Sequence, residues 1–314
     1  MRNIYLIAFI GTVLGFVSCD HIDDPYPPAI SQGSYELYPD GDSAHYWSNA
    51  APTFSANTNT LRNILIEDFT GHQCVYCPPA ADTAHSLHSD YGDRVLVATI
   101  HAGPDGLGNF QATSPSLPID WTNTEGIAIG EHFGNLSSGF IGNPRGTISR
   151  IESSGDLTLG MNSWRSAVTA NLPTTLQVNI QSAANYYPST RGLFLHTEIE
   201  VLGGVNPDDL RVVVYLIEDS IVGPQKMPPP LPTEPDYVHA DVMRECIGST
   251  WQGLPLTADD LENGKYYLNY IYELPMQSNA TQPTNYEADN MHLLIYVRDI
   301  NTEEIYHVVK QSLQ

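Results

Sequence analysis

The chain has 314 residues, with 13 lysines and arginines against 36 aspartates and glutamates, and a formal net charge of −23 at pH 7. This length exceeds that of one ordinary domain and is sufficient for two hydrophobic cores. So acidic a balance excludes binding to nucleic acid, whose phosphates require clustered lysine and arginine, and electrostatic docking on anionic lipid.

The first 18 residues have the features of an export signal. Arg2 precedes an apolar run from Ile4 to Val17, which is too short to span a bilayer as a helix. The segment ends in Ser18-Cys19, which resembles a bacterial lipobox, where a small residue precedes the cysteine that is lipidated. We therefore expect residues 1–18 to be a lipoprotein signal peptide and Cys19 to carry the lipid anchor. An ordinary secretory signal with an incidental cysteine is the alternative.

Residues 19–60 are rich in proline, serine, asparagine, aspartate, tyrosine and alanine, and they show no sustained period. This composition predicts a flexible tether that holds a folded body away from the membrane. The acidic residues directly after Cys19 resemble the surface-export signal of some Gram-negative lipoproteins, although linkers are often acidic for other reasons.

The stretch after residue 63 carries the reactive groups of the chain. An apolar run over 64–69 predicts a buried strand, Cys74 and Cys77 follow at C-x-x-C spacing, and a helix is predicted over 79–91. Strand, C-x-x-C and helix form the arrangement of a dithiol redox site, because a helix N-terminus lowers the pKa of a nearby thiol. In this interpretation Cys74 is the exposed nucleophile and Cys77 is the resolving thiol.

Other interpretations of the cysteine pair remain open at this point. The pair is alternatively a structural disulfide on an inherited fold, or part of a metal site with histidines from the set His72, His85, His88 and His101. Structural zinc sites normally show four closely specified ligands, and a second C-x-x-C is missing here. Attached c-type haem is excluded because residue 78 is proline. We therefore expect no cofactor and no metal.

The elements that follow complete an α/β pattern. They are a strand over 94–101, a short helix over 124–133 within a loop-rich segment, a turn leading into a strand over 141–150 and a closing helix within 157–172. The order strand, helix, strand predicts a parallel pair.

Beyond residue 172 the pattern changes to strands alone. The predicted strands are 174–180, 192–201, 210–217, 266–272, 292–297 and 305–309. Their alternation and spacing indicate an antiparallel sandwich of the immunoglobulin-like kind. The proline-rich stretch 223–235 is predicted to be an exposed loop. Cys246 has no evident mate and is predicted to be a small buried hydrophobic residue.

Residues 61–172 resemble a thioredoxin-like domain. Asp68 lies on the strand just ahead of the C-x-x-C, as a carboxylate does in that family, and Pro144 stands where a cis-proline loop faces the disulfide. The resemblance implies that Asp68 relays a proton to Cys77, the alternative being a satisfied polar group at a strand end. It also implies that Pro144 is cis and that the backbone at Asn143 pairs with an extended substrate, the alternative being a trans proline in a turn.

A closer resemblance is to the 28-kilodalton outer-membrane-protein-related lipoproteins. It rests on Phe69-Thr70-Gly71, on the run from Cys74 to Pro78 and on Asn143-Pro144. That family also has a β-rich C-terminal half. The resemblance implies an α/β thioredoxin-like domain over 61–172, followed by an all-β, immunoglobulin-like sandwich over 173–314. It also implies attachment to the outer membrane, on a face that the sequence leaves open.

Two functions follow from these features. The first is thiol–disulfide exchange on extracytoplasmic proteins, with Cys74 attacking and Cys77 resolving. His72 would assist by stabilising the thiolate if it is protonated, the alternative being a solvated turn residue. The second function is a non-enzymatic surface lipoprotein, an adhesin or binding module that uses the thioredoxin fold as a platform. The expected partners are extracytoplasmic proteins or surface ligands, with the membrane contacted through the lipid anchor.

Overall fold

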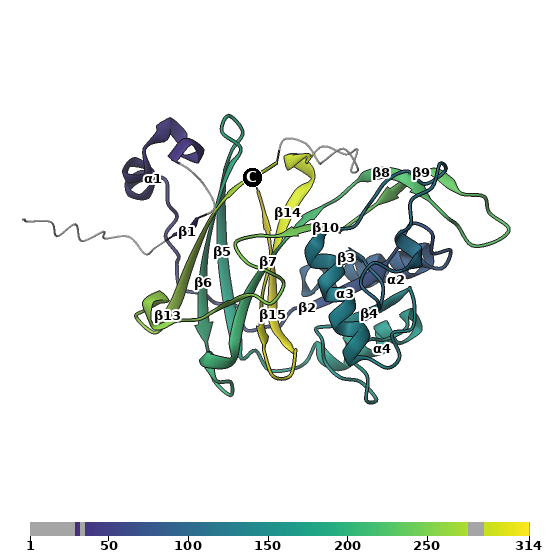
Figure 1. Ribbon diagram of the computed structural model, residues 1–314. Helices are drawn as coiled ribbons and strands as arrows, with labels where there is room; N and C mark the ends of the chain where they lie inside the picture. Colours follow the sequence, from purple (N-terminus) through teal and green to yellow (C-terminus); the bar gives the residue numbers. More distant parts are fainter. Residues whose placement is uncertain (1–28, 32–34, 276–285, 314) are drawn as a thin grey trace, which may run out of the picture.

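The computed structural model describes residues 29–31, 35–275 and 286–313 (Figure 1). The predicted signal peptide over 1–18 and the predicted lipidation site Cys19 lie outside the described residues. The described chain forms a small sheet, a large sheet behind it and a group of helices around one half of the large sheet.

The helical part contains three strands of the large sheet, β2 (Ile64–Thr70), β3 (Val95–His101) and β4 (Arg145–Ile148). β2 pairs with β3 in parallel, as predicted, and with β4 in the antiparallel sense. Every residue of β2 and β3 is buried, as expected for strands that are covered on both faces.

Helices cover both faces of this half of the sheet (Figure 1). α2 (Cys77–Tyr91) and α4 (Met161–Asn171) pack on the face that carries Ile64 and Ile66. α3 (Thr124–Leu136) packs on the opposite face. These helices confirm the three predicted from the sequence, with shifts of a few residues at their ends.

The β-rich part consists of two sheets packed face to face around a shared apolar core. The small sheet has the order β1 (Ala29–Ser31), β13 (Lys265–Glu273), β6 (Gly192–Val201) and β5 (Val178–Tyr187), with β12 (Leu261–Glu262) on β13. Facing it are β7 (Leu210–Glu218), β14 (Met291–Asp299) and β15 (Ile305–Ser312), with β11 (Leu254–Pro255) on β7. The six strands predicted in this region correspond to β5, β6, β7, β13, β14 and β15, and β6 has the predicted bounds. The prediction for β5 is misplaced, because this strand shares only residues 178–180 with the predicted 174–180.

One strand joins the two parts of the chain into a single large sheet. β10 (Val242–Cys246) pairs with β7 on one side and with β3 on the other, where Val242 lies opposite Thr99. The order of the large sheet is therefore β15-β14-β7-β10-β3-β2-β4. The boundary that the sequence places between residues 172 and 173 is crossed by this sheet.

A buried ion pair reinforces this junction. Glu67 on β2 and Arg150 after β4 are both completely buried, and the guanidinium donates two hydrogen bonds of 2.7 and 2.8 Å to the carboxylate. The hydroxyl groups of Tyr215 on β7 and Tyr296 on β14 complete the network. Burial alone would raise the pKa of Glu67, but the charge and hydrogen bonds of Arg150 hold this pKa below its ordinary value.

Residues 35–60, predicted as part of a flexible tether, instead pack against the small sheet. α1 (Ser43–Asn49) places the ring of Tyr46 4.4 Å from that of Phe194, and the Tyr46 hydroxyl lies 2.6 Å from His196 Nε2. Leu37 and Tyr38 are buried in the same cluster. The polar composition of the segment did not indicate this packing, because only a few aromatic side chains supply the apolar surface that contacts the sheet.

The proline-rich stretch 223–235 is also more ordered than predicted. Its ends belong to β8 (Ile221–Gln225) and β9 (Glu234–His239), which form a separate antiparallel hairpin (Figure 1). Prolines are tolerated there because a two-stranded ribbon has two free edges. The prediction of an exposed loop therefore holds only for the residues between the strands, and Gln225 is 2% exposed.

Replacing Arg150 with methionine should lower the free energy of unfolding by about 3–5 kcal/mol, because the Glu67 carboxylate then stays buried without a counter-ion. Urea denaturation measures this change. Arg165→Met is the matched control, since its guanidinium pairs with Asp90 on the surface, where both side chains are half exposed. The control should change stability by less than about 1 kcal/mol, and equal small effects of both substitutions would contradict the proposed weight of the buried pair.

Candidate functional site at the buried disulfide

Cys74 and Cys77 form a disulfide at the start of helix α2, with their Cα atoms 5.4 Å apart. Cys77 is the first residue of the helix, and a turn held by the hydrogen bond from Cys74 N to Gly71 O precedes it. Pro78 and Pro79 occupy the first helical turn, where backbone N–H groups lack helical partners in any case. The position of the pair at a helix N-terminus therefore agrees with the prediction.

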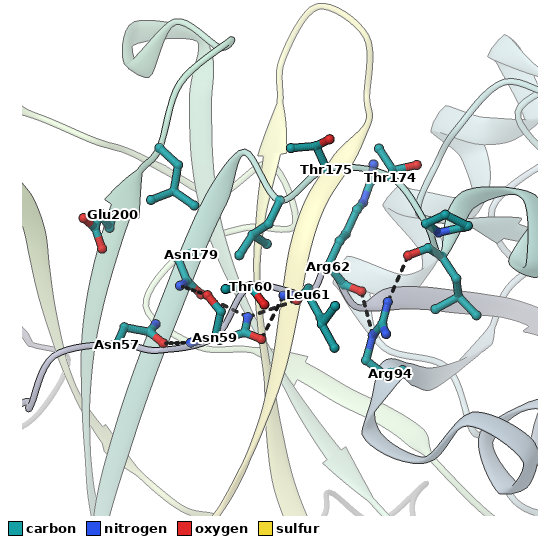
Figure 2. Close-up of a pocket in the computed structure, with 14 residues that line it drawn as sticks. Asn57, Asn59, Thr60, Leu61, Arg62, Arg94, Thr174, Thr175, Asn179 and Glu200 are labelled. Atoms are coloured by element: carbon teal, nitrogen blue, oxygen red, sulfur yellow. Dashed lines mark hydrogen bonds between the residues drawn. The ribbon is translucent and has the colours of Figure 1, made fainter.

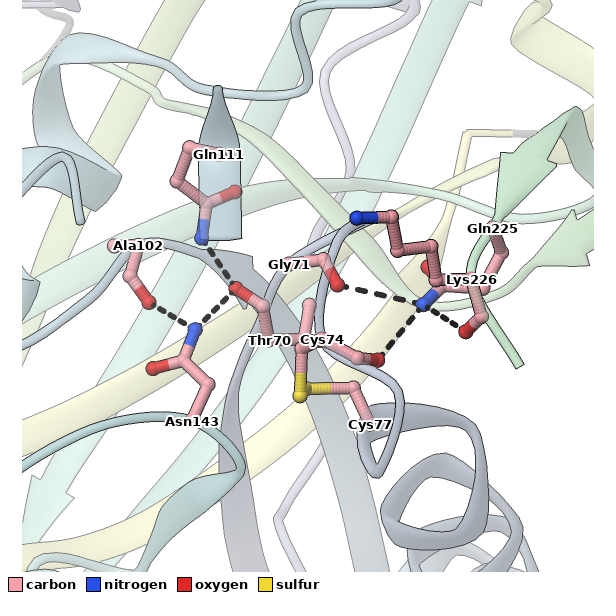
Figure 3. The surroundings of a disulfide bond; sticks show 9 residues. All are labelled: Thr70, Gly71, Cys74, Cys77, Ala102, Gln111, Asn143, Gln225 and Lys226. Atoms are coloured by element: carbon pink, nitrogen blue, oxygen red, sulfur yellow. Dashed lines mark hydrogen bonds between the residues drawn. A yellow bond between two sulfur atoms is a disulfide. The ribbon is translucent and has the colours of Figure 1, made fainter. Parts of the chain in front are cut away.

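The exposure of the pair does not agree with it. Cys74 and Cys77 are each 1% exposed, so the prediction of an exposed Cys74 nucleophile is wrong for this structure. The first reason is the β8–β9 hairpin. The Gln225 side-chain amide donates to Cys74 O at 3.1 Å (Figure 3). The Lys226 backbone N–H donates to His72 O at 2.9 Å.

A loop from the other side completes the cover. The Gln73 backbone N–H donates to Phe110 O at 3.1 Å. The Gln111 side chain donates to Thr70 O at 2.6 Å (Figure 3). Gly71 allows this close approach, because a Cβ atom at that position would lie 2.7 Å from Phe110 O. The C-x-x-C turn is thus clamped between two segments that lie far from it in the sequence.

The Asn143–Pro144 peptide bond is cis, as the resemblance implied. The Asn143 side-chain amide donates to Thr70 O at 2.6 Å and to Ala102 O at 2.8 Å (Figure 3). These two bonds attach the cis-proline loop to the ends of β2 and β3. The predicted pairing of the Asn143 backbone with a substrate stays a prediction.

Asp68 is completely buried in β2. Strand alternation directs it to the face covered by α2, whereas the preceding Glu67 faces Arg150 on the other side. Within the described residues neither carboxylate oxygen of Asp68 has a hydrogen-bond partner. Burial raises the pKa of Asp68 to about 7, with a smaller opposing effect from His85. Asp68 is therefore able to exchange a proton near neutral pH, and its relay to Cys77 stays a prediction.

The histidine predicted to assist a thiolate is unsuited to that role. His72 is buried, its Nε2 lies 2.9 Å from Ala112 O, and burial lowers its pKa, so the ring is neutral at pH 7. His101 and His239 are buried nearby, with ring centroids 5.7 Å apart, and burial lowers their pKa values as well. No positive charge from these rings is available to stabilise a sulfur anion at neutral pH.

The residues that cover the disulfide carry no local signal in the sequence. Gln225 lies 151 positions from Cys74, and Gln111 lies 41 positions from Thr70. A cavity of about 20 Å³ remains beside Cys77, with Thr99, Tyr237 and His239 in its wall. It has room for about one water molecule and none for a peptide.

Comparison with known proteins decides the family. Residues 137–314 match the family model described as outer membrane protein Omp28, and this match covers more than half of the chain. The chain belongs to the Omp28 family. It is accordingly an outer-membrane protein. In the part of the chain that the structure describes, every helix is too short or too polar to cross a membrane.

Solved structures show which folds resemble this Omp28-family chain. HBP35 of Porphyromonas gingivalis has 17% identity and a TM-score of 0.56, covering 82% of this chain and 77% of that one, which indicates a shared fold. A protein from Agrobacterium tumefaciens has 11% identity and a TM-score of 0.49, covering 80% and 94%. A domain of the outer membrane lipoprotein Omp28 from P. gingivalis has 22% identity and a TM-score of 0.29, covering 43% and 86%. No curated protein matches the chain.

A second candidate site in this Omp28-family chain is an open groove of about 770 Å³ between the helical part and the small sheet (Figure 2). Its polar side chains hold the backbone together. The Arg94 guanidinium donates to Arg62 O and Leu172 O, both at 2.9 Å, and Asn59 and Asn179 bond to each other. These side chains are already hydrogen-bonded within the protein. The groove therefore has space for a ligand, but these groups do not form a reactive site.

Replacing Asp68 with asparagine should stabilise the protein above pH 7 and have little effect near pH 4. The folded-state pKa of about 7 exceeds the ordinary value of 3.8, so between these values the folded chain holds a proton that the unfolded chain has released. Wild-type stability therefore falls as pH rises through this window, and the variant lacks this fall.

Urea denaturation at pH 4 to 8 measures the effect, which should reach roughly 2–4 kcal/mol. Asp90→Asn, at a half-exposed site, is the control. A difference between Asp68→Asn and wild type that does not change with pH would show that Asp68 ionises normally.

Proposed function

We propose that the protein is a lipid-anchored, non-enzymatic binding platform of the outer membrane, in which the Cys74–Cys77 disulfide is structural. The observation that carries this proposal is the 1% exposure of both cysteines beneath Gln225 and the loop at Phe110. A catalytic thiolate must reach the disulfide sulfur of its substrate, and this cover leaves no path for a protein substrate. The proposed partners are extracytoplasmic proteins or surface ligands.

The fold assigned to this platform is a thioredoxin-like part joined to an immunoglobulin-like sandwich. The parallel β2–α2–β3 unit, the antiparallel β4 and the cis Asn143–Pro144 bond support the first assignment. The strand orders β5-β6-β13 and β15-β14-β7 support the second, because they correspond to strands A-B-E and G-F-C of immunoglobulin domains. β1 takes the remaining edge position beside β13.

Thiol–disulfide exchange is the second candidate function, and Asp68 is the observation that favours it. A fully buried carboxyl group without a hydrogen-bond partner and with a pKa of about 7 is suited to proton transfer. In this function the β8–β9 hairpin first moves away, and a dithiol reductant opens the 74–77 bond and is itself oxidised to a disulfide. The reduced Cys74 thiolate then attacks a substrate disulfide and forms a mixed disulfide, releasing one substrate thiolate. Cys77 displaces the second substrate sulfur as a thiolate and closes the 74–77 bond again.

Thiol chemistry separates the two functions. In the structural case the wild-type pair has a reduction potential below about −300 mV, and insulin reduction does not depend on Cys74. The double variant Gln225→Ala/Lys226→Ala removes the bond from the Gln225 amide to Cys74 O and the bond of 2.9 Å from Lys226 Nζ to Gln73 Oε1. Loss of these two side-chain hydrogen bonds, about 1 kcal/mol each, should loosen the hairpin and speed reduction by dithiothreitol about tenfold or more. Cys246→Ser, which removes a buried free thiol, is the control.

Turnover of insulin by the wild-type protein that disappears in Cys74→Ser would overturn the structural assignment. Turnover that appears only in the Gln225→Ala/Lys226→Ala variant would instead identify the hairpin as the gate of the second candidate function. The two functions therefore give different results in the same pair of assays.

The lipid anchor is tested at Cys19, which follows Ser18 in the lipobox-like sequence. Cells that express the wild-type chain should incorporate labelled palmitate into it and retain it in the outer-membrane fraction. Cys19→Ala should abolish the label and release the protein, since acyl chains are the proposed attachment. Retention and labelling of Cys19→Ala would contradict this assignment, and protease treatment of intact cells would identify the exposed face.

A further inference from the structure

A cluster of carboxylate and imidazole groups lies where β7, β10 and β14 meet helix α2. Asp219 directly follows β7, Asp241 directly precedes β10, and His292 lies in β14. One ligand atom from each of these residues lies within 4.8 Å of the other two. His85 on α2 adds a fourth group, with its Nε2 3.4 Å from Asp241 Oδ2.

Strand register brings these residues together. Glu218, the last residue of β7, pairs with Val242, the first residue of β10, and with Met291 of β14. Asp219 follows Glu218 and Asp241 precedes Val242, so the two aspartates lie next to each other. The partner of His292 is Ile217, two residues before Asp219 and therefore on the same face of β7.

We propose that Asp219, Asp241 and His292, together with His85, bind a divalent transition-metal ion of the zinc type. Two imidazole nitrogens and two carboxylate oxygens form a donor set that zinc accepts, whereas magnesium and calcium prefer oxygen donors alone.

The distances between the donors fit a four-coordinate ion. Ligand atoms that lie about 2.1 Å from zinc at tetrahedral angles are about 3.4 Å from one another. The His85–Asp241 distance is 3.4 Å, and the distance from His292 Nδ1 to Asp219 Oδ2 is 3.5 Å. Each imidazole–carboxylate pair thus already has the separation of one tetrahedral edge. Asp219, Asp241 and His292 form the group whose ligand atoms lie within 4.8 Å of one another, and His85, which contacts Asp241, moves toward the other two to complete the site.

The buried position of His292 distinguishes this cluster from an ordinary group of acidic residues on the surface. Its side chain is 5% exposed, and its Nδ1 lies 3.5 Å from Asp219 Oδ2. A dication bound here would relieve the repulsion between the carboxylates of Asp219 and Asp241.

Backbone hydrogen bonds hold the two carboxylates in position. The Asp241 N–H donates to Asp219 Oδ1 at 2.8 Å, the Asp219 N–H donates to Asn290 O at 3.0 Å, and Asp241 O accepts from Thr99 N at 2.7 Å. Such outer contacts orient the ligands in metal sites. The His85 side chain is 44% exposed and provides the path of entry. A bound ion would connect helix α2 to three strands of the large sheet.

Isothermal titration of the detergent-solubilised, metal-free full chain with zinc chloride tests the proposal, with no reductant present so that the disulfide stays closed. Wild type should bind one zinc ion at this site, and zinc should raise the melting temperature. His292→Ala and Asp241→Asn should each weaken binding at least tenfold, a lower limit set by the effect of losing even an outer contact of a metal site. Magnesium and calcium chloride should bind far more weakly.

The control is His132→Ala, because His132 pairs with Glu303 at 3.1 Å in a similar contact that Arg150 and Arg298 surround. Its zinc affinity should equal that of wild type. If His292→Ala fails to fold, His85→Ala decides the question, since this half-exposed helical residue is removable without loss of core packing. Absence of zinc binding, binding unchanged in His85→Ala and His292→Ala, or equal affinity for calcium would each overturn the proposal.

Discussion

Glu67 and Arg150 place opposite charges where no solvent reaches either of them, and this arrangement is stable only while every neighbouring partner is present. The Tyr215 and Tyr296 hydroxyl groups come from β7 and β14, and the ring of Phe133 on α3 lies 5.0 Å from the guanidinium carbon. The ion pair lies within the helical part, but two of its hydrogen-bond partners come from the β-rich part. It requires the β-rich part, and the shared large sheet supplies the required geometry.

This constraint has a direct consequence for the disulfide. Because β10 joins β7 to β3, the hairpin that precedes it emerges over the C-x-x-C turn, and Gln225 and Lys226 reach the backbone of that turn. The two cysteines at the N-terminus of α2, a position that would favour a reactive thiolate, are therefore buried in the core. The same junction brings Asp219, Asp241 and His292 together beside α2.

Local patterns in the sequence predicted the local structure well. The bounds of β6 and the strand–helix–strand unit around Cys74 agree with the sequence, because alternation, turn residues and the C-x-x-C spacing act over a few positions. The cis bond at Pro144 agrees with what the thioredoxin-like resemblance implied. Contacts between distant residues could not be predicted. Glu67 meets Tyr215 across 148 positions, and no periodic pattern reports such a pairing.

The errors have the same origin. Tyr46 docks on a sheet formed more than a hundred residues later, so its segment had the composition of a tether without behaving as one. The burial of Cys74 depends on Gln225, in a stretch whose prolines indicated a loop. In both places a minority of side chains determined the structure against the average composition of the segment.

The central claim is that both parts of the chain form one cooperative unit, and native-state hydrogen exchange of the full chain tests it most directly. The account predicts that the slowest amides of β2 and β3 and those of β7 and β14 exchange with the same free energy and the same dependence on denaturant. Exchange of β2 and β3 at a clearly lower free energy, while β7 and β14 stay protected, would show two independent units and contradict the account.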